Sequence, residues 1–290
     1  MPRKPDAILL KDHLLFGDSI EEAISKSGGQ SAIPGYKGIL YEVTGEDCFG
    51  NRIFKKIGEN TVTVGGAIVS LEKLCGVQAT WKPKTLNELH NIDTDLVVKD
   101  DSKNTQIYLF GVGTGGCGLE FGSIVEKDEK MRETPGIIPL RSGSVLSGDD
   151  ANNYKFKLNN GDGTYNWYLK EFSDPPIIKT CWKDALDEDS DGTEVTDEIQ
   201  DSTRTEKLQT FTEYILDFNT KDVREYYESI GSLDNALYNS IGLYTADKVI
   251  REDNTYDYAN IRLFCYLNID NKSVRIKTAS QYIYRILSLV

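Results

Sequence analysis

Histidine is scarce in this chain of 290 residues, in which His13 and His90 are the only two. Histidine is the commonest metal ligand and titrates near neutral pH, so metal centres and catalytic triads built on imidazole are disfavoured. The chain also lacks the GxSxG, HExxH and GxxxxGK[ST] motifs. We therefore expect a protein that is not an enzyme and carries no cofactor, and we expect His90 to be a packing or helix-surface residue.

Long apolar segments are also missing. Residues 7–10 are too short for the core of a signal peptide, and nowhere do 18 apolar residues follow one another as in a membrane-spanning helix. Cysteines are few, odd in number and without a CxxC pair, which is typical of reduced thiols. We expect a protein made in the cytoplasm, without membrane contact, whose cysteines are small buried apolar residues. They are Cys48, Cys75, Cys117, Cys181 and Cys265.

Positive charge is in the minority, with 33 Lys and Arg against 46 Asp and Glu and a net charge of −13. Binding to nucleic acid depends on cationic side chains that neutralise phosphates, so the sequence predicts no direct nucleic-acid contact. Residues 183–201 are the most acidic stretch, with nine carboxylates and one lysine. Such a block repels itself and is typical of a solvated loop or linker.

The chain does contain aromatic residues, sixteen of them tyrosine, and many segments in which apolar and polar residues alternate. Alternation predicts β-strands. Four short segments are predicted to be helices, and Thr220 is expected to cap the last of them. The predicted fold class is α+β, β-rich, with mixed or antiparallel sheets and a few short helices. Strands are expected at 37–57 (two, around a turn at 45–51), 105–110, 154–172 (a hairpin), 210–219, 235–246, 260–269 and 280–290, and helices at 18–29, 66–76, 84–92 and 221–231.

Pro175 and Pro176 interrupt the chain just before the acidic stretch. This change in composition predicts an N-terminal β-rich α+β region at 1–175, with a glycine-rich loop and the hairpin. An acidic loop or linker follows at 176–206, and a C-terminal α+β sheet region at 207–290.

The glycine-rich segment Gly111–Gly116 matches GxGxxG and follows an expected strand. In a dinucleotide-binding fold the next element is a helix whose N-terminus meets the pyrophosphate. Here Gly118 and Gly122 would weaken that helix. About twenty residues on, where a strand should end in a ribose-binding acidic residue, the chain reads TPGIIPLR (134–141). We therefore expect a glycine-rich loop, open to close approach by another chain.

The acidic stretch contains a match to the calcium loop pattern DxDxDGx5E, with the required residue at every specified position. In such a loop alternate carboxylates converge on one ion and a distal glutamate binds it. Glu194 replaces the usual aliphatic residue, and in so acidic a stretch a match arises easily by chance. A solvated loop is the favoured interpretation, and calcium binding is the alternative. The residues concerned are Asp187, Asp189, Asp191, Thr193 and Glu198.

Aromatic residues alternate along the expected hairpin at Tyr165, Trp167 and Tyr168. Burial in the core or in a subunit contact is the ordinary role of such residues, and binding of a sugar or peptide is the minority role. We expect the ordinary role here.

Several segments between about residue 105 and residue 290 share a family pattern. The run DFNTKDVREYYESIGSLDNALYNSIGLYTA (217–246) has a helix of the DxREYF kind followed by an xxNSIGL strand, and LFCYLN (263–268) and IYRI (283–286) follow it. The glycine-rich FGVGTGGCGLEFG, IPLR (138–141) and NWYLKEFSDPPIIKTCWKD fit the same pattern. This part of the chain resembles structural proteins of tailed bacteriophage virions, although Cys265 replaces an expected serine.

The resemblance implies a non-enzymatic part of a phage tail, baseplate or neck, present in several copies in a ring-like assembly with other virion structural proteins. It implies a virion protein made in the host cytoplasm, and it transfers no catalytic residue. An alternative function from the acidic stretch is a calcium-stabilised binding module that recognises a host glycan or protein.

Overall fold

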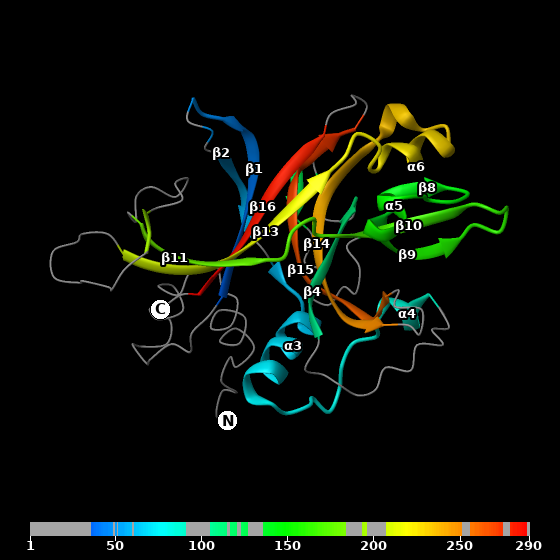
Figure 1. Cartoon of the computed structure of the whole chain (residues 1–290). Coiled ribbons are helices and arrows are strands. Elements are labelled where there is room, and N and C mark those ends of the chain that lie inside the picture. The colour runs from blue at the N-terminus through cyan, green and yellow to red at the C-terminus, as the bar shows by residue number, and fades with distance from the viewer. Residues whose placement is uncertain are drawn as a thin grey trace. The chain divides into compact units, whose positions relative to one another are not determined.

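The structure is a computed structural model of the whole chain (Figure 1). The predicted helix at 18–29, His13 and most of the acidic stretch lie outside the residues that it describes. Those residues are 36–48, 50, 52–59, 61–90, 105–114, 117–120, 123–126, 136–183, 193–195, 207–250, 256–274 and 279–288.

The chain forms two compact units, each assembled from separated stretches of sequence. Unit 1 comprises Met1–Asn60, Asp174–Leu216 and Gln281–Val290, and unit 2 comprises Thr61–Ser173 and Asp217–Ser280. The predicted boundaries near 175 and 206 describe contiguous regions, whereas here the chain passes between the units four times. The difference arises because strands near the two ends of the chain pair with each other, which local composition does not reveal.

Unit 1 contains a six-stranded sheet in the order β12-β11-β13-β16-β1-β2. Its apolar core gathers side chains from β1, β2, β11, β13 and β16, among them Tyr41, Phe54 and Phe211. Strand β1 pairs antiparallel with β16, so that Tyr36 lies opposite Ser288. The strands are β1 (Tyr36–Glu46), β2 (Arg52–Glu59), β11 (Ile177–Lys183), β12 (Thr193–Glu194), β13 (Lys207–Phe218) and β16 (Ser280–Ser288).

Unit 2 contains an eight-stranded sheet in the order β3-β15-β14-β4-β10-β8, with β7 on β4 and β9 on β10. Its core includes Leu109, Leu169 and Tyr244. A separate two-stranded sheet joins β5 and β6. The strands are β3 (Thr61–Val62), β4 (Thr105–Gly113), β5 (Cys117–Glu120), β6 (Ser123–Glu126), β7 (Ile137–Ile138), β8 (Arg141–Gly143), β9 (Tyr154–Asn159), β10 (Tyr165–Glu171), β14 (Leu237–Ile250) and β15 (Tyr256–Ser273).

The predicted hairpin is confirmed as β9 and β10, which pair antiparallel. The connecting loop folds because Asn159 Oδ1 accepts a hydrogen bond from the Gly161 N–H at 2.8 Å and Asp162 Oδ1 accepts one from the Thr164 N–H at 2.9 Å. Gly161 has a φ of 86°, which a residue with a side chain rarely adopts. Local sequence therefore suffices to form this turn.

The helices described are short, and all of them belong to unit 2. They are α3 (Val64–Cys75), α4 (Leu86–Leu89), α5 (Asp149–Asn153) and α6 (Arg224–Ser229), with a 3-10 turn η2 at Leu233–Asn235. Helix α3 packs closely against β15. A Cβ on Gly66 would lie 2.1 Å from the Phe264 carbonyl oxygen, so this position accepts only glycine. Within the described residues, no helix is long and apolar enough to cross a membrane.

The predicted fold class is confirmed: the chain is β-rich with a few short helices, and every strand pair with a described register is antiparallel. Two local predictions are wrong. Thr220 does not cap α6, because the N-cap position is Val223 and has no side-chain cap. Cys48 and Cys75 are exposed, whereas Cys181 and Cys265 are buried as predicted; all four are free thiols.

Candidate functional site

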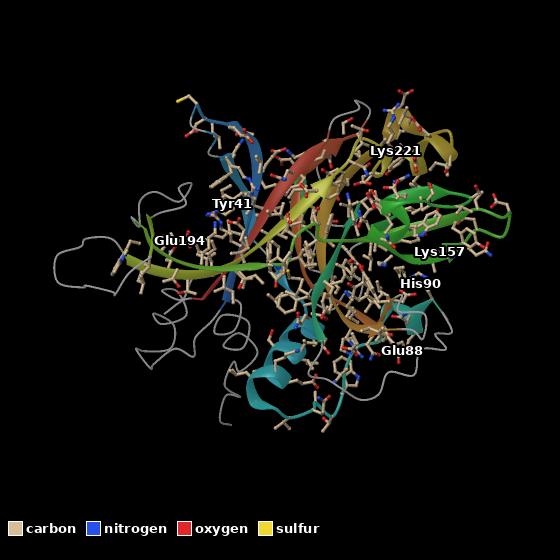
Figure 2. The ribbon with its side chains drawn as sticks, in the orientation of Figure 1. Tyr41, Glu88, His90, Lys157, Glu194 and Lys221 are labelled. Carbon is tan, nitrogen blue, oxygen red and sulfur yellow. The ribbon has the colours of Figure 1, made fainter. Side chains whose placement is uncertain are left out.

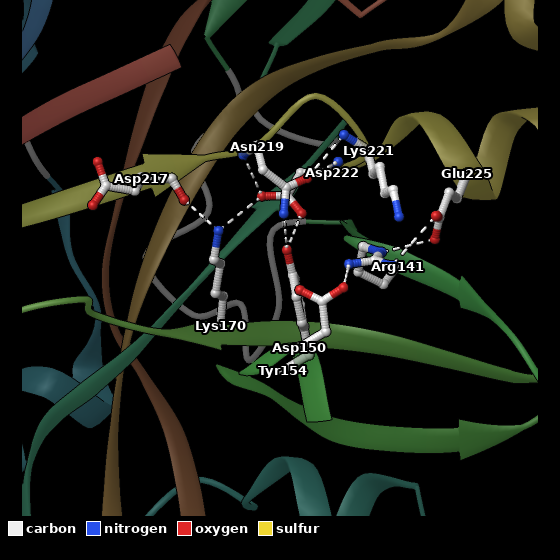
Figure 3. A network of polar contacts seen from close by, with 9 residues as sticks. All are labelled: Arg141, Asp150, Tyr154, Lys170, Asp217, Asn219, Lys221, Asp222 and Glu225. Atoms are coloured by element: carbon white, nitrogen blue, oxygen red, sulfur yellow. Dashed lines mark hydrogen bonds and ion pairs between the residues drawn. The ribbon is translucent and has the colours of Figure 1, made fainter. Parts of the chain in front are cut away.

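A group of polar residues in unit 2, four of them buried, joins three separate parts of its chain (Figure 3). It connects β8, β9 and β10 with the turn that links β13 to α6, and we call it the polar network. Its members are Arg141, Asp150, Tyr154, Lys170, Asp217, Asn219, Lys221, Asp222 and Glu225.

Asp222 lies at the centre of the polar network with a fully buried side chain. Its Oδ1 accepts a hydrogen bond from the Tyr154 hydroxyl. Its Oδ2 accepts bonds from the Asn219 N–H at 2.9 Å and from Lys170 Nζ at 3.1 Å. Burial raises the pKa of Asp222, while Lys170 and the hydrogen bonds oppose that rise.

The groups around Asp222 are themselves paired. Lys170 Nζ also donates to the Asp217 carbonyl oxygen at 2.6 Å. The Tyr154 hydroxyl accepts from Asn219 Nδ2 at 2.7 Å, and burial followed by the Asp222 charge raises the pKa of Tyr154. Asn219 Oδ1 accepts from the Lys221 N–H at 2.8 Å. A buried charge is tolerated in a protein when such partners surround it.

Arg141 forms the second half of the polar network. Its Nε donates to Glu225 at 2.7 Å and its Nη1 donates to Asp150 at 2.7 Å. Its guanidinium carbon lies 5.0 Å from the centre of the Tyr154 ring. Burial acts against the charge, but the carboxylates outweigh it and raise the pKa of Arg141. Arg141 therefore holds α6 through Glu225 and α5 through Asp150.

The backbone at the start of α6 is strained. Val223 is fully buried with a φ of 67° and a ψ of −38°, a conformation that β-branched residues rarely adopt. Its N–H donates to the Leu140 carbonyl oxygen at 2.7 Å. Strain of this kind persists only where surrounding contacts over-determine the backbone, and here the polar network supplies those contacts.

The hydrogen bonds of the polar network favour a role in attaching α6 to the sheet of unit 2. Both oxygens of Asp222 accept hydrogen bonds, and the Tyr154 hydroxyl both donates and accepts. A nucleophile or general base needs a free lone pair directed toward a substrate, whereas these lone pairs are directed at neighbouring protein groups. The polar network therefore fixes the position of α6.

The glycine-rich segment is placed differently from the prediction. Gly111 and Gly113 lie within β4, opposite Gly242 and Ser240 of β14, and the next element is the strand β5, where a dinucleotide-binding fold would have a helix. A Cβ on Gly111 would lie 2.8 Å from Leu169 Cδ2. The expectation of a loop open to another chain is therefore wrong at Gly111, because the close approach occurs inside the unit 2 sheet.

The calcium pattern stays a prediction. Thr193 lies in β12, opposite Trp182 of β11, whereas Asp187, Asp189, Asp191 and Glu198 lie outside the described residues. Within the part of the chain that the structure describes, no three His, Cys, Asp or Glu side chains are grouped to hold a metal ion.

The predictions for His90 and the hairpin aromatics hold. The ring of His90, labelled in Figure 2 beside α4, packs edge-on against Phe156 with 5.4 Å between ring centres. Trp167 is buried, and Tyr168 packs against the unit 2 core. Tyr165 is partly buried, and Lys157 Nζ lies 4.5 Å from the centre of its ring. These rings therefore have a packing role.

The polar network was not predicted, because its members are spread from residue 141 to residue 225. Seven of its nine members fall in IPLR, NWYLKEF and DFNTKDVREYY, three segments singled out in the sequence analysis, whereas Asp150 lies in α5 and Tyr154 directly follows it. Comparisons of the chain with known protein families, with curated proteins and with solved structures found no match.

Proposed function

We propose that the protein is a non-enzymatic structural component of a tailed phage virion, in the baseplate, tail or neck. It acts through contacts between subunits, in several copies and with other virion structural proteins. The proposal places it in the virion after synthesis in the host cytoplasm.

One observation carries the proposal. Three segments that resemble phage structural proteins meet in the polar network: Arg141 of IPLR, Lys170 of NWYLKEF, and Asp222 and Glu225 of DFNTKDVREYY. These segments are far apart in sequence. If each supplies part of one contact in the folded protein, that contact gives a physical reason for the three segments to share a pattern. The resemblance therefore concerns a fold-defining contact.

The energetics of the polar network suit a structural role. Helix α6 has six residues, and an isolated helix of that length is unstable in water. Two ion pairs and the Val223–Leu140 hydrogen bond hold it against the sheet of unit 2. A rigid attached helix can present a fixed surface to a neighbouring subunit at little entropic cost.

The experiment is detection of the protein in tailed particles purified from cells that carry its gene. Quantitative peptide mass spectrometry should find it in a constant ratio to the other tail proteins. Its absence from intact tailed particles would contradict the proposal.

A matched pair of variants connects this test to the polar network. Particles formed with Asp222→Ala should be defective, because the turn before α6 loses its bonds to Lys170 and Tyr154. Particles formed with Asp149→Ala, which alters an exposed aspartate near the network, should match wild type. Normal particles with Asp222→Ala would show that the network has no part in assembly.

A further inference from the structure

The end of α3 and the segment after it expose three large apolar side chains. Leu74 is 73% exposed, Val77 is 65% exposed and Trp81 is 58% exposed. We call residues 74–84 the Trp81 loop; it continues from α3 toward α4 in unit 2 (Figure 1). An isolated exposed apolar side chain is ordinary, but a cluster of them on one segment marks an interaction site.

The Trp81 loop is held in one conformation by Glu72. The Gly76 N–H donates to the Glu72 carbonyl oxygen at 2.8 Å, with Gly76 at a φ of 66°. Glu72 Oε1 accepts from the Ala79 N–H at 2.6 Å and pairs with Lys82 Nζ at 2.8 Å. Lys82 Nζ also donates to Gln78 Oε1 at 2.8 Å.

These bonds have a consequence for binding. Ordering a loop on association costs free energy, and a loop already fixed by hydrogen bonds avoids much of that cost. Tryptophan is also the residue type most enriched among side chains that dominate interface energies. A fixed segment that exposes Trp81, Leu74 and Val77 is therefore suited to burial in a contact with a partner.

Charge indicates what that partner is. Residues 72–84 contain three lysines (Lys73, Lys82 and Lys84) and one glutamate, a net charge of +2. Subtracting this from the total of −13 leaves −15 on the rest of the chain. A locally basic segment on a strongly acidic protein is complementary to the acidic surface of another copy.

We propose that the Trp81 loop docks on an acidic face of a second copy of this chain. Such a contact joins two different surfaces, so it is heterologous and closes into a ring when the rotation between copies allows it. The inference rests on the proposed function in one respect, the presence of several copies, and it adds the surface through which they meet.

The test is the mass of the purified full-length protein, measured by sedimentation over a range of concentrations up to about 100 μM. Wild type should self-associate, and added salt should weaken the association because exposed charges are screened. Trp81→Ala should weaken it about tenfold or more. The control is Ile250→Ala, which removes a side chain that is 70% exposed on β14 and should behave as wild type.

A mixing experiment tests the heterologous geometry. Trp81→Ala subunits keep the acidic face, so they should bind wild-type subunits and end growing chains as small oligomers. Circular dichroism confirms that each variant is folded.

Three results would overturn the inference: a wild-type protein that stays monomeric, a Trp81→Ala variant that associates as wild type does, or a Trp81-dependent contact with a different protein in place of self-association. Because the first two results are measured on the purified protein alone, they are separate from those of the particle experiment.

Discussion

Among the described residues, each unit of this protein buries one arginine, and the two arginines are accommodated differently. In unit 1, Arg285 of β16 is 3% exposed. Its Nε and Nη2 both donate to Glu213 Oε2, at 3.0 and 2.9 Å. Its guanidinium carbon lies 5.1, 5.0 and 4.8 Å from the ring centres of Tyr41, Phe54 and Phe211 respectively.

In unit 2, Arg141 is 4% exposed but has two carboxylates and one ring as neighbours. The side chains of Asp150 and Glu225 keep 35% and 25% of their surface in solvent. Arg141 is therefore a buried cation whose anions remain hydrated, whereas Arg285 and Glu213 are both removed from water.

The difference shows how one residue type carries two energetic roles. A fully buried ion pair incurs a desolvation cost that mutual attraction must offset, and losing one partner leaves an uncompensated charge. Aromatic faces add attraction to the guanidinium but do not replace a carboxylate. Unit 1 is therefore expected to be the more sensitive of the two to loss of a carboxylate.

The largest expected effect is that of Glu213→Ala. Removing this carboxylate leaves Arg285 buried among aromatic rings, and the free energy of unfolding should fall by about 3–5 kcal/mol. Denaturant unfolding combined with hydrogen exchange of peptides from β1 and β16 measures this loss and assigns it to unit 1.

Glu225→Ala is the matched variant in unit 2. Arg141 would keep Asp150 and the solvated side of its ion pair, so we expect a loss of about 1 kcal/mol. Equal losses for the two variants would mean that the hydration of the anions does not distinguish the units.

A pH-dependent effect, smaller than that of Glu213→Ala, is expected from Asp222→Asn, which should cost about 1–3 kcal/mol at pH 7 through the weakened bonds to Lys170 and Tyr154. Burial raises the pKa of Asp222 in the folded state above its ordinary value of 3.8. Folding therefore takes up a proton at this site.

The sign of the pH effect follows from that shift. The contribution of Asp222 is fully present below its unfolded-state pKa and is lost as pH rises through the raised folded-state pKa. The stability of wild type relative to Asp222→Asn should therefore be greater at pH 4 than at pH 7. A difference that shrinks toward low pH would show that hydrogen bonding, and not burial, dominates the pKa of Asp222.

The smallest effect is expected from Tyr244→Phe, at a position fully buried in unit 2. Within the described residues its hydroxyl has no hydrogen-bond partner, unlike the paired groups of the polar network. Removing an unpaired buried hydroxyl should leave stability unchanged or raise it by up to about 1 kcal/mol. Thermal unfolding measures this, and a loss above about 1 kcal/mol would indicate a partner such as a buried water.

Much of the secondary structure was predictable because it depends on local chemistry. The hairpin at 154–172 needs only alternating side chains and a turn of Asn, Gly and Asp residues, and it is present as β9 and β10. The start of α6 could not be predicted in the same way. Thr220 is a normal capping residue, but Val223 takes the N-cap position because its N–H bonds to Leu140, eighty-three positions away.

The candidate site differs from the hairpin for the same physical reason. The sequence alone determined the β-rich class, the scarcity of imidazole and the net negative charge, since composition and alternation require no knowledge of contacts. Only the tertiary structure decided that Arg141, Lys170 and Asp222 are neighbours, that Gly111 packs inside a sheet and that Trp81 remains exposed. Burial and hydrogen bonding depend on which distant strands pair, and that choice is made by the whole chain at once.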